Sequence, residues 1–192
     1  MKHKLSILFL VVYFALNTLF AQELEKYNGK YGGPFISFGK TKFGNTFTIG
    51  GGGIFVMKKS FFLGIFGQTS GVFLPVKSEK FDYTDYNMKS RYTGFFIGYF
   101  QSFKKSNKFY LSYYSKFGFG QVYLDNKSTS KTIYDSTFLI EPNIELVYSV
   151  ARFFKIGVGA FYDIHTGVNL LDYKNSDFNS YGISINFRFV AS

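Results

Sequence analysis

The sequence predicts an all-β fold, specifically a closed, antiparallel, eight-stranded up-and-down transmembrane β-barrel. Aromatic residues make up 22% of the 192 residues, with 27 Phe and 16 Tyr, and there are 20 Gly. This composition favours strands and tight turns over helices. The segment YGISINFRFV, residues 181–190, places a large apolar side chain at every second position. A period of two is typical of a strand with one apolar face and one polar face.

Residues 1–21 have the pattern of a secretory signal peptide. Lys2 and Lys4 precede an uncharged apolar run from Leu5 to Leu16, and Ala21 supplies a small residue before the expected cleavage site. The apolar run is too short to be a comfortable transmembrane helix. We therefore expect residues 22–192 to be exported as one barrel domain, and the absence of cysteine excludes disulfide bonds from its stability.

Alternation and breaks predict eight strands, at residues 31–40, 45–57, 60–73, 91–103, 108–124, 136–149, 152–164 and 179–190. Most are longer than soluble strands and close to the roughly 9–11 residues that cross a bilayer at a tilt. The connections at 58–60, 104–107 and 150–151 are short, whereas those at 41–44, 74–90, 125–135 and 165–178 are longer. Short turns at one end and long polar loops at the other are typical of outer-membrane barrels.

The polar rows of the later strands carry charges near mid-strand. In a closed barrel these rows face the lumen, which in an eight-stranded barrel is only wide enough for its own side chains. We expect a lumen charge network of five residues: Lys116, Glu141, Glu145, Lys155 and Arg188. Such charges must pair with one another and with trapped water.

The apolar rows decide between a membrane barrel and a soluble sheet. In a soluble sandwich the same charges would be a solvated face, but the predicted chain has no helices to cover eight rows of Phe, Ile, Leu and Tyr. Lipid covers them, and a bilayer then requires the sheet to close because it satisfies no backbone hydrogen bonds. A secreted soluble β-barrel that binds a small apolar ligand stays as an alternative.

The last predicted strand carries the most specific motif of the sequence. Ser180, Gly182, Ile185 and Phe187 follow the polar, glycine, hydrophobic and aromatic spacing of a C-terminal assembly signal. With the leader and the eight alternating segments, the chain resembles the small outer-membrane β-barrel proteins of Gram-negative bacteria, of the OmpX-like and OmpA-transmembrane-domain type. The likeness spans Gly29 to Phe189 and implies insertion by the barrel-assembly machinery.

Catalytic chemistry has little support in the sequence. His165 is the one histidine of the exported part, and there is no cysteine and no paired-histidine metal spacing, so we expect neither a metal nor a cofactor. Some small outer-membrane barrels are lipid A deacylases or acyltransferases that use a histidine, which keeps His165, beside Asp163 and Thr166, as an alternative site. We expect instead a loop histidine at the headgroup level. A pore is disfavoured because large side chains fill the lumen.

The remaining functional surface is the loops. Without Lys2 and Lys4, 20 of the 22 basic residues remain against 12 acidic ones, a formal charge of +8. Export disfavours nucleic acid as a partner, whereas lipopolysaccharide, outer-membrane lipids, or an unidentified ligand or envelope protein suit the second loop. Its candidate contacts are Lys77, Lys80, Tyr83, Tyr86 and Lys89. The sequence thus predicts a monomeric, non-enzymatic integral outer-membrane protein that contributes to envelope integrity or surface interaction.

Overall fold

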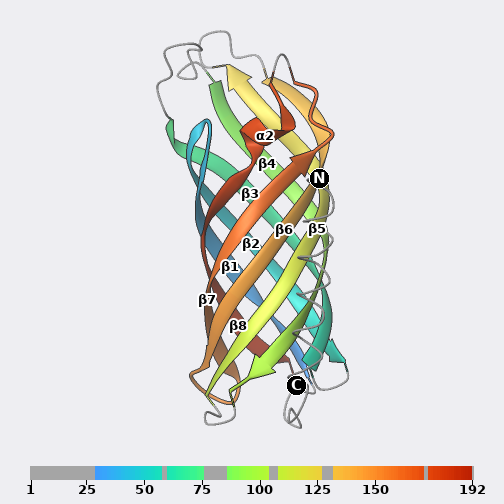
Figure 1. Cartoon of the computed structure of the whole chain (residues 1–192), viewed down its shortest axis with the longest axis vertical. Coiled ribbons are helices and arrows are strands. Elements are labelled where there is room, and N and C mark those ends of the chain that lie inside the picture. The colour runs from blue at the N-terminus through green and yellow to red at the C-terminus, as the bar shows by residue number, and fades with distance from the viewer. Residues whose placement is uncertain are drawn as a thin grey trace, which may run out of the picture.

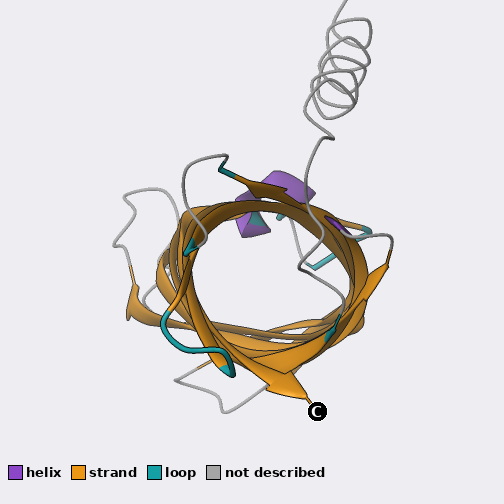
Figure 2. Ribbon diagram, turned by 90° about the horizontal axis from the view of Figure 1, so that it is seen from below, coloured by secondary structure: helices purple, strands orange, loops and turns teal. Residues whose placement is uncertain are grey.

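The computed structural model describes residues 29–57, 60–75, 86–103, 108–126, 132–170 and 173–191. The predicted signal peptide therefore lies outside the described residues. The strands are β1 (Lys30–Thr41), β2 (Gly44–Met57), β3 (Phe61–Pro75), β4 (Tyr86–Ser102), β5 (Phe109–Asn126), β6 (Thr132–Ser149), β7 (Phe154–Thr166) and β8 (Ser180–Ala191). Each pairs antiparallel with the next, and β8 pairs with β1, so the sheet closes into a ring (Figure 1 and Figure 2). The predicted fold class is confirmed.

Large apolar side chains cover the outward face of every strand. Ile65 is 72% exposed and Phe119 is 67% exposed, values far above those of a protein core. Exposed residues of this kind occur on β1 to β8 in turn, for example Phe38, Ile49, Ile65, Ile97, Phe119, Ile144, Val158 and Ile183. We refer to this outward surface as the apolar belt. A continuous apolar surface of this extent is not found on monomeric soluble proteins without a covering partner.

Six strands agree with the predicted boundaries to within two residues, and two strands are longer. β4 begins at Tyr86 instead of residue 91, and β6 begins at Thr132 instead of residue 136. In the extension of β4, Met88 is buried inside the barrel and the outward residue is the exposed Lys89, whereas the belt has apolar residues outside. The strands therefore continue beyond the apolar belt, where the outward row becomes polar.

Aromatic rings and glycines fit together inside the barrel. A Cβ atom at Gly50 would overlap the ring of Phe35, and one at Gly98 would overlap the ring of Phe62. Both rings are almost completely buried. Glycine is required at these inward positions because a ring from another strand fills the space that any larger side chain would need. The lumen around Phe35 and Phe62 is consequently packed with aromatic side chains.

The loop between β7 and β8 packs against the β1–β2 turn at one end of the barrel. It contains the one-turn helix α2 (Asn175–Phe178), which the sequence pattern did not predict because four residues show no helical period. The ring of Phe178 is buried and lies 5.1 Å from the ring of Phe43. We call the buried group at this mouth the cap, made of Phe43, Val168, Leu170, Tyr173 and Phe178. No helix in the described ranges is long and apolar enough to cross a membrane.

Two prolines interrupt the hydrogen-bonded wall. Within the described strands, Gly33 and Pro34 of β1 have no pairing partner on β8, and Glu141 and Pro142 of β6 have none on β7. The pairs on either side of each interruption keep the same register. Proline has no N–H to donate to a neighbouring strand, which explains a gap at each place. At these two places the neighbouring strands lack the pairing that continues on either side.

Candidate functional site

The five charged residues expected in the lumen all face it. Lys116 lies on β5, Glu141 and Glu145 on β6, Lys155 on β7 and Arg188 on β8, so they occupy four neighbouring strands. Glu145 has no exposed surface, and Lys116 and Glu141 are each 3% exposed. The alternation of each strand places these residues inside because their sequence neighbours face the apolar belt. Charges buried to this degree are tolerated only with partners.

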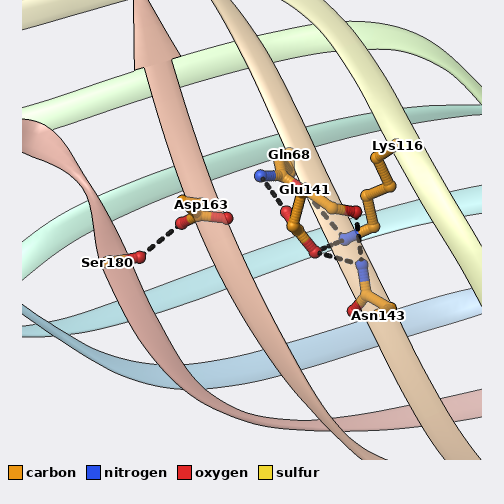
Figure 3. A network of polar contacts seen from close by, with 6 residues as sticks. All are labelled: Gln68, Lys116, Glu141, Asn143, Asp163 and Ser180. Atoms are coloured by element: carbon orange, nitrogen blue, oxygen red, sulfur yellow. Dashed lines mark hydrogen bonds and ion pairs between the residues drawn. The ribbon is translucent and has the colours of Figure 1, made fainter. Parts of the chain in front are cut away.

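Lys116 and Glu141 form the first ion pair of the interior. The Lys116 Nζ lies 2.8 Å from the Glu141 Oε1 and donates a hydrogen bond of 3.1 Å to the Gln68 Oε1. The Gln68 Nε2 donates to the Glu141 Oε2 at 3.3 Å, and the Asn143 Nδ2 donates to the Glu141 Oε1 at 3.0 Å. Figure 3 shows the side chains of Gln68, Lys116 and Asn143 converging on the Glu141 carboxylate. Gln68 was not predicted, although it occupies the inward row of β3 beside Phe66.

Arg188 and Glu145 form the second ion pair, through the Arg188 Nη2 and the Glu145 Oε2. The guanidinium group also lies 5.5 Å from the centre of the Phe100 ring. The Glu145 carboxylate lies over Gly157, where any side chain would collide with it. This pair joins β6 to β8 across β7, so it fixes the lumen side of three neighbouring strands.

Lys155 contacts tyrosines in the same part of the lumen. Its Nζ donates a hydrogen bond of 3.3 Å to the Tyr31 hydroxyl and lies 4.6 Å from the centre of that ring. The Tyr110 ring centre is 5.2 Å away. An ammonium group over aromatic faces is stabilised by the ring quadrupole. The lumen therefore contains cation–π contacts in addition to the two ion pairs.

The predicted assembly signal divides between the two faces of β8. Ser180 and Gly182 face the lumen, and Ile185 and Phe187 face outward, as the alternation requires. The Ser180 hydroxyl donates a hydrogen bond to the Asp163 carboxylate inside the barrel (Figure 3). Ser180 thus has a contact in the folded barrel, and recognition of the four residues by an assembly machinery stays a prediction.

His165 does not lie in a loop, as the sequence had suggested, but within β7. It is 4% exposed, faces the lumen beneath the cap, and its Nδ1 is 2.8 Å from the Tyr92 hydroxyl. Its backbone N–H donates to the Asn179 Oδ1 at 2.9 Å. The expected loop position of His165 is therefore wrong, whereas its depth relative to the headgroups stays a prediction. The strand continues to Thr166, and the inward parity of residue 165 carries the ring into the barrel.

Two of the five predicted loop contacts are strand residues in the structure. Tyr86 is the first residue of β4, and Lys89 also lies on β4, whereas Lys77, Lys80 and Tyr83 lie outside the described residues. Lys89 lies on the exposed outer face of β4, where its Nζ is 2.8 Å from the Asp125 Oδ2. This residue, predicted as a loop contact, is thus a strand residue above the apolar belt.

The interior of the barrel combines paired charges with aromatic side chains. The inward residues Phe96, Phe100, Tyr110, Tyr114 and Phe161 are all buried. No group of three or more histidine, cysteine or acidic side chains suited to a metal ion occurs among the described residues. The paired charges stabilise the closed wall from within, and their side chains occupy the space a channel would need.

Two solved structures have a similar fold. Neisserial surface protein A matches with a TM-score of 0.62 at 9% sequence identity, over 83% of this chain and 94% of that one. The N-terminal β-barrel domain of OprF from Pseudomonas aeruginosa matches with a TM-score of 0.53 at 8% identity, over 86% of this chain and all of that one. No protein-family model matches the chain, and no curated protein matches it significantly. The shared fold is that of small outer-membrane eight-stranded barrels.

Proposed function

We propose that the chain is a non-enzymatic integral outer-membrane protein that contributes to envelope integrity or to surface interaction through its extracellular loops. The observation that carries the proposal is the distribution of side chains across the wall. Every strand exposes apolar residues outward, while the charges of the lumen are buried and paired. Hydrocarbon is the one environment in which such a surface is stable without a protein partner.

The lengths of the connections support one orientation of the barrel. The strand ends joined by residues 58–60, 103–108 and 150–153 meet at one rim, and the ends joined by 76–85, 127–131 and 167–179 meet at the other, with α2 (Figure 1). The connection expected to be longer at 41–44 is an exception, since only Lys42 and Phe43 join β1 to β2. In outer-membrane barrels short turns face the periplasm and long loops face outward. The cap therefore faces the outside of the cell, and the partners of the protein are outer-membrane lipids, lipopolysaccharide and the assembly machinery that inserts it as a monomer.

Cell fractionation tests the proposal most directly. We expect to find the protein in the outer-membrane fraction, from which only detergent releases it. On a gel, the unheated folded protein should migrate differently from the heated protein. Protease added to intact cells should cut within residues 76–85 or 127–131 and leave the short-turn end untouched. Recovery in the soluble periplasmic fraction, folded without any amphiphile, would contradict the proposal and favour a soluble barrel.

A lipid A-modifying enzyme centred on His165 is less well supported. The ring of His165 bonds to Tyr92 beneath the cap, and the nearby Ser180 hydroxyl donates to Asp163. A nucleophilic serine would instead need to donate its proton to the imidazole. Identical lipid A mass spectra from wild-type cells, cells lacking the protein and cells with His165→Ala support the non-enzymatic proposal. A change in acyl-chain number that depends on His165 would establish the enzyme.

A further inference from the structure

Two cations lie together on the outer face of β4, directly above the apolar belt. Toward the rim on which α2 lies, the outward row of this strand contains Phe95, Thr93, Arg91 and Lys89 in that order. Phe95 pairs with Ile65 of β3 inside the belt, whereas Arg91 pairs with Thr69. The four residues from Phe95 to Arg91 span about 13 Å of strand. The outward row therefore changes from apolar to cationic where the belt ends.

The outward rows of the other described strands have no such pair of consecutive cations. Near the same rim, Lys40 of β1 is the one other outward cation on these strands. The outward residues that flank Arg91 and Lys89 are uncharged: Thr69 and Gly71 on β3, and Gln121 and Tyr123 on β5. Positive charge is thus concentrated at one place on the outer wall. We call the group of Lys89, Arg91, Gly71 and Tyr123 the β4 basic site.

The guanidinium group of Arg91 has no acidic partner among the described residues. It lies 5.9 Å from the centre of the Tyr123 ring, a cation–π contact. The polar side chains beside Arg91 are bonded elsewhere, since the Thr69 hydroxyl donates to the Ser90 carbonyl oxygen and the Tyr123 hydroxyl donates to Gln121. A guanidinium group offers five N–H donors in a planar fork that suits the oxygens of a phosphate. Arg91 is therefore available to an anion from outside the chain.

Lys89 adds a second exposed charge next to this group. Its Nζ lies 2.8 Å from the Asp125 Oδ2, and 54% of its side chain is exposed. An ammonium group has three N–H donors, so the pair with Asp125 leaves donors for another acceptor. Gly71 faces Lys89, and a Cβ atom at Gly71 would meet only the Lys89 side chain, at 4.0 Å. The wall beside the two cations is therefore open.

The level of the site on the wall selects a lipid phosphate as its occupant. A lipid whose acyl chains cover Phe95 and Ile65 places its headgroup beside Arg91 and Lys89. Residues two apart on one face of a strand are about 7 Å apart, so one phosphate can contact both long side chains. A phosphomonoester carries a charge of about −1.5 to −2 at pH 7 and three terminal oxygens. The phosphodiester of a common phospholipid has a single charge and fewer free oxygens, which favours the monoester here.

We propose that the β4 basic site binds a phosphomonoester of a phosphorylated glycolipid, the headgroup chemistry of lipid A. The phosphate accepts hydrogen bonds from Arg91 and Lys89, and the Tyr123 ring positions the guanidinium group. The acyl chains lie on Phe95 and Ile65 in the apolar belt. The inference rests on the proposed function, because such a lipid reaches the site only when the α2 rim faces the outer leaflet.

Native mass spectrometry of the detergent-refolded barrel with diphosphorylated lipid A tests the inference. We expect one retained lipid A per barrel, and at least about tenfold weaker retention of phosphatidylglycerol. Arg91→Gln with Lys89→Gln should weaken retention of lipid A at least about tenfold, because it removes both charge-assisted donors. Lys40→Gln is the matched control, since it removes an outward cation near the same rim but on β1. Heat-modifiable migration verifies that each variant is folded.

The headgroup provides a second test that leaves the protein unchanged. Lipid A from which both phosphates have been removed keeps its sugars and acyl chains, and we expect the wild-type barrel to retain it as weakly as the double variant retains intact lipid A. Inorganic phosphate should not displace lipid A, because the acyl chains on the belt contribute to its binding. Complete displacement by millimolar phosphate would contradict a lipid as the occupant.

Equal retention of lipid A by the wild type and the double variant would overturn the inference. Equal retention of lipid A with and without its phosphates would also overturn it, as would a loss in Lys40→Gln as large as that in the double variant. These outcomes leave the proposed function intact as long as the variants still require detergent and show heat-modifiable migration. A barrel that stays folded without amphiphile would instead remove the proposed function.

Discussion

The carboxylate of Glu145 occupies the space that a side chain on Gly157 would need. Gly157→Ala must displace the carboxylate from Arg188, so we predict a loss of about 1–3 kcal/mol in the free energy of unfolding, typical of overpacking. Urea titration in lipid vesicles, followed by heat-modifiable migration, measures it. Gly67→Ala is the control, since its Cβ atom meets nothing within 4 Å. Equal midpoints for the two variants would contradict the assigned position of Glu145.

Removal of Arg188 should cost more than reversal of an exposed lysine. Arg188→Met leaves Glu145 buried without its cation, and we expect a loss of about 3–5 kcal/mol, with Arg188→Glu at least as severe. Lys89→Glu breaks an exposed pair with Asp125 and should cost about 1 kcal/mol or less. The same urea titration compares them.

The double variant Arg188→Met with Glu145→Gln isolates the cause of that loss. It removes both charges together, so we expect it to be more stable than Arg188→Met alone. If the two effects simply add, the buried pair between Arg188 and Glu145 is not the source of the instability.

The fold could be predicted because the bilayer makes the sequence pattern simple. Within the belt each strand alternates between lipid and lumen, so parity alone assigns every side chain to a face. This is why the inward positions of Lys116, Glu141 and Arg188 follow from the sequence. Beyond the belt both faces are polar or both are mixed, and the pattern fails. The first residues of β4 and β6, and the end of β7 with His165, lie there.

The contacts of the interior could not be predicted in the same way. Lys116 lies beside Glu141 in the β5–β6 register, but its partner Gln68 comes from β3, and the partner of Lys155, Tyr31, comes from β1. Which residues meet across a lumen depends on the stagger of all eight strands, which no single strand encodes. The cap is hidden for a similar reason, since Phe43 and Phe178 are far apart in sequence.

The cap should loosen when its central ring is removed. Phe43 is 2% exposed and packs against the rings of Tyr173 and Phe178, at 5.2 and 5.1 Å. Phe43→Ala should lower the free energy of local opening by roughly 3–5 kcal/mol. Amide hydrogen exchange of residues 168–170 and 173–179 measures it, because opening of the cap exposes their N–H groups.

Lys42→Ala is the matched control for the cap. Lys42 is a neighbour of Phe43 and pairs with Asp177 of α2 at 3.0 Å, but its side chain is largely exposed. An exposed ion pair contributes about 1 kcal/mol or less. Exchange rates that rise more for Lys42→Ala than for Phe43→Ala would show that charge, not ring packing, holds the cap.

An arginine placed in the apolar belt should destabilise a barrel covered by lipid but not one covered by water. Ile65 lies on the outward row of β3 between Phe61 and Thr69, so in a bilayer Ile65→Arg should cost about 2–4 kcal/mol of unfolding free energy, as for a cation near the midplane. Tyr134→Arg, at the polar end of β6, should cost about 1 kcal/mol or less because it meets headgroups. In water, arginine at either exposed position would be nearly neutral. Urea unfolding in vesicles measures both variants. Equal free energies of unfolding would contradict contact between lipid and the outward face at Ile65.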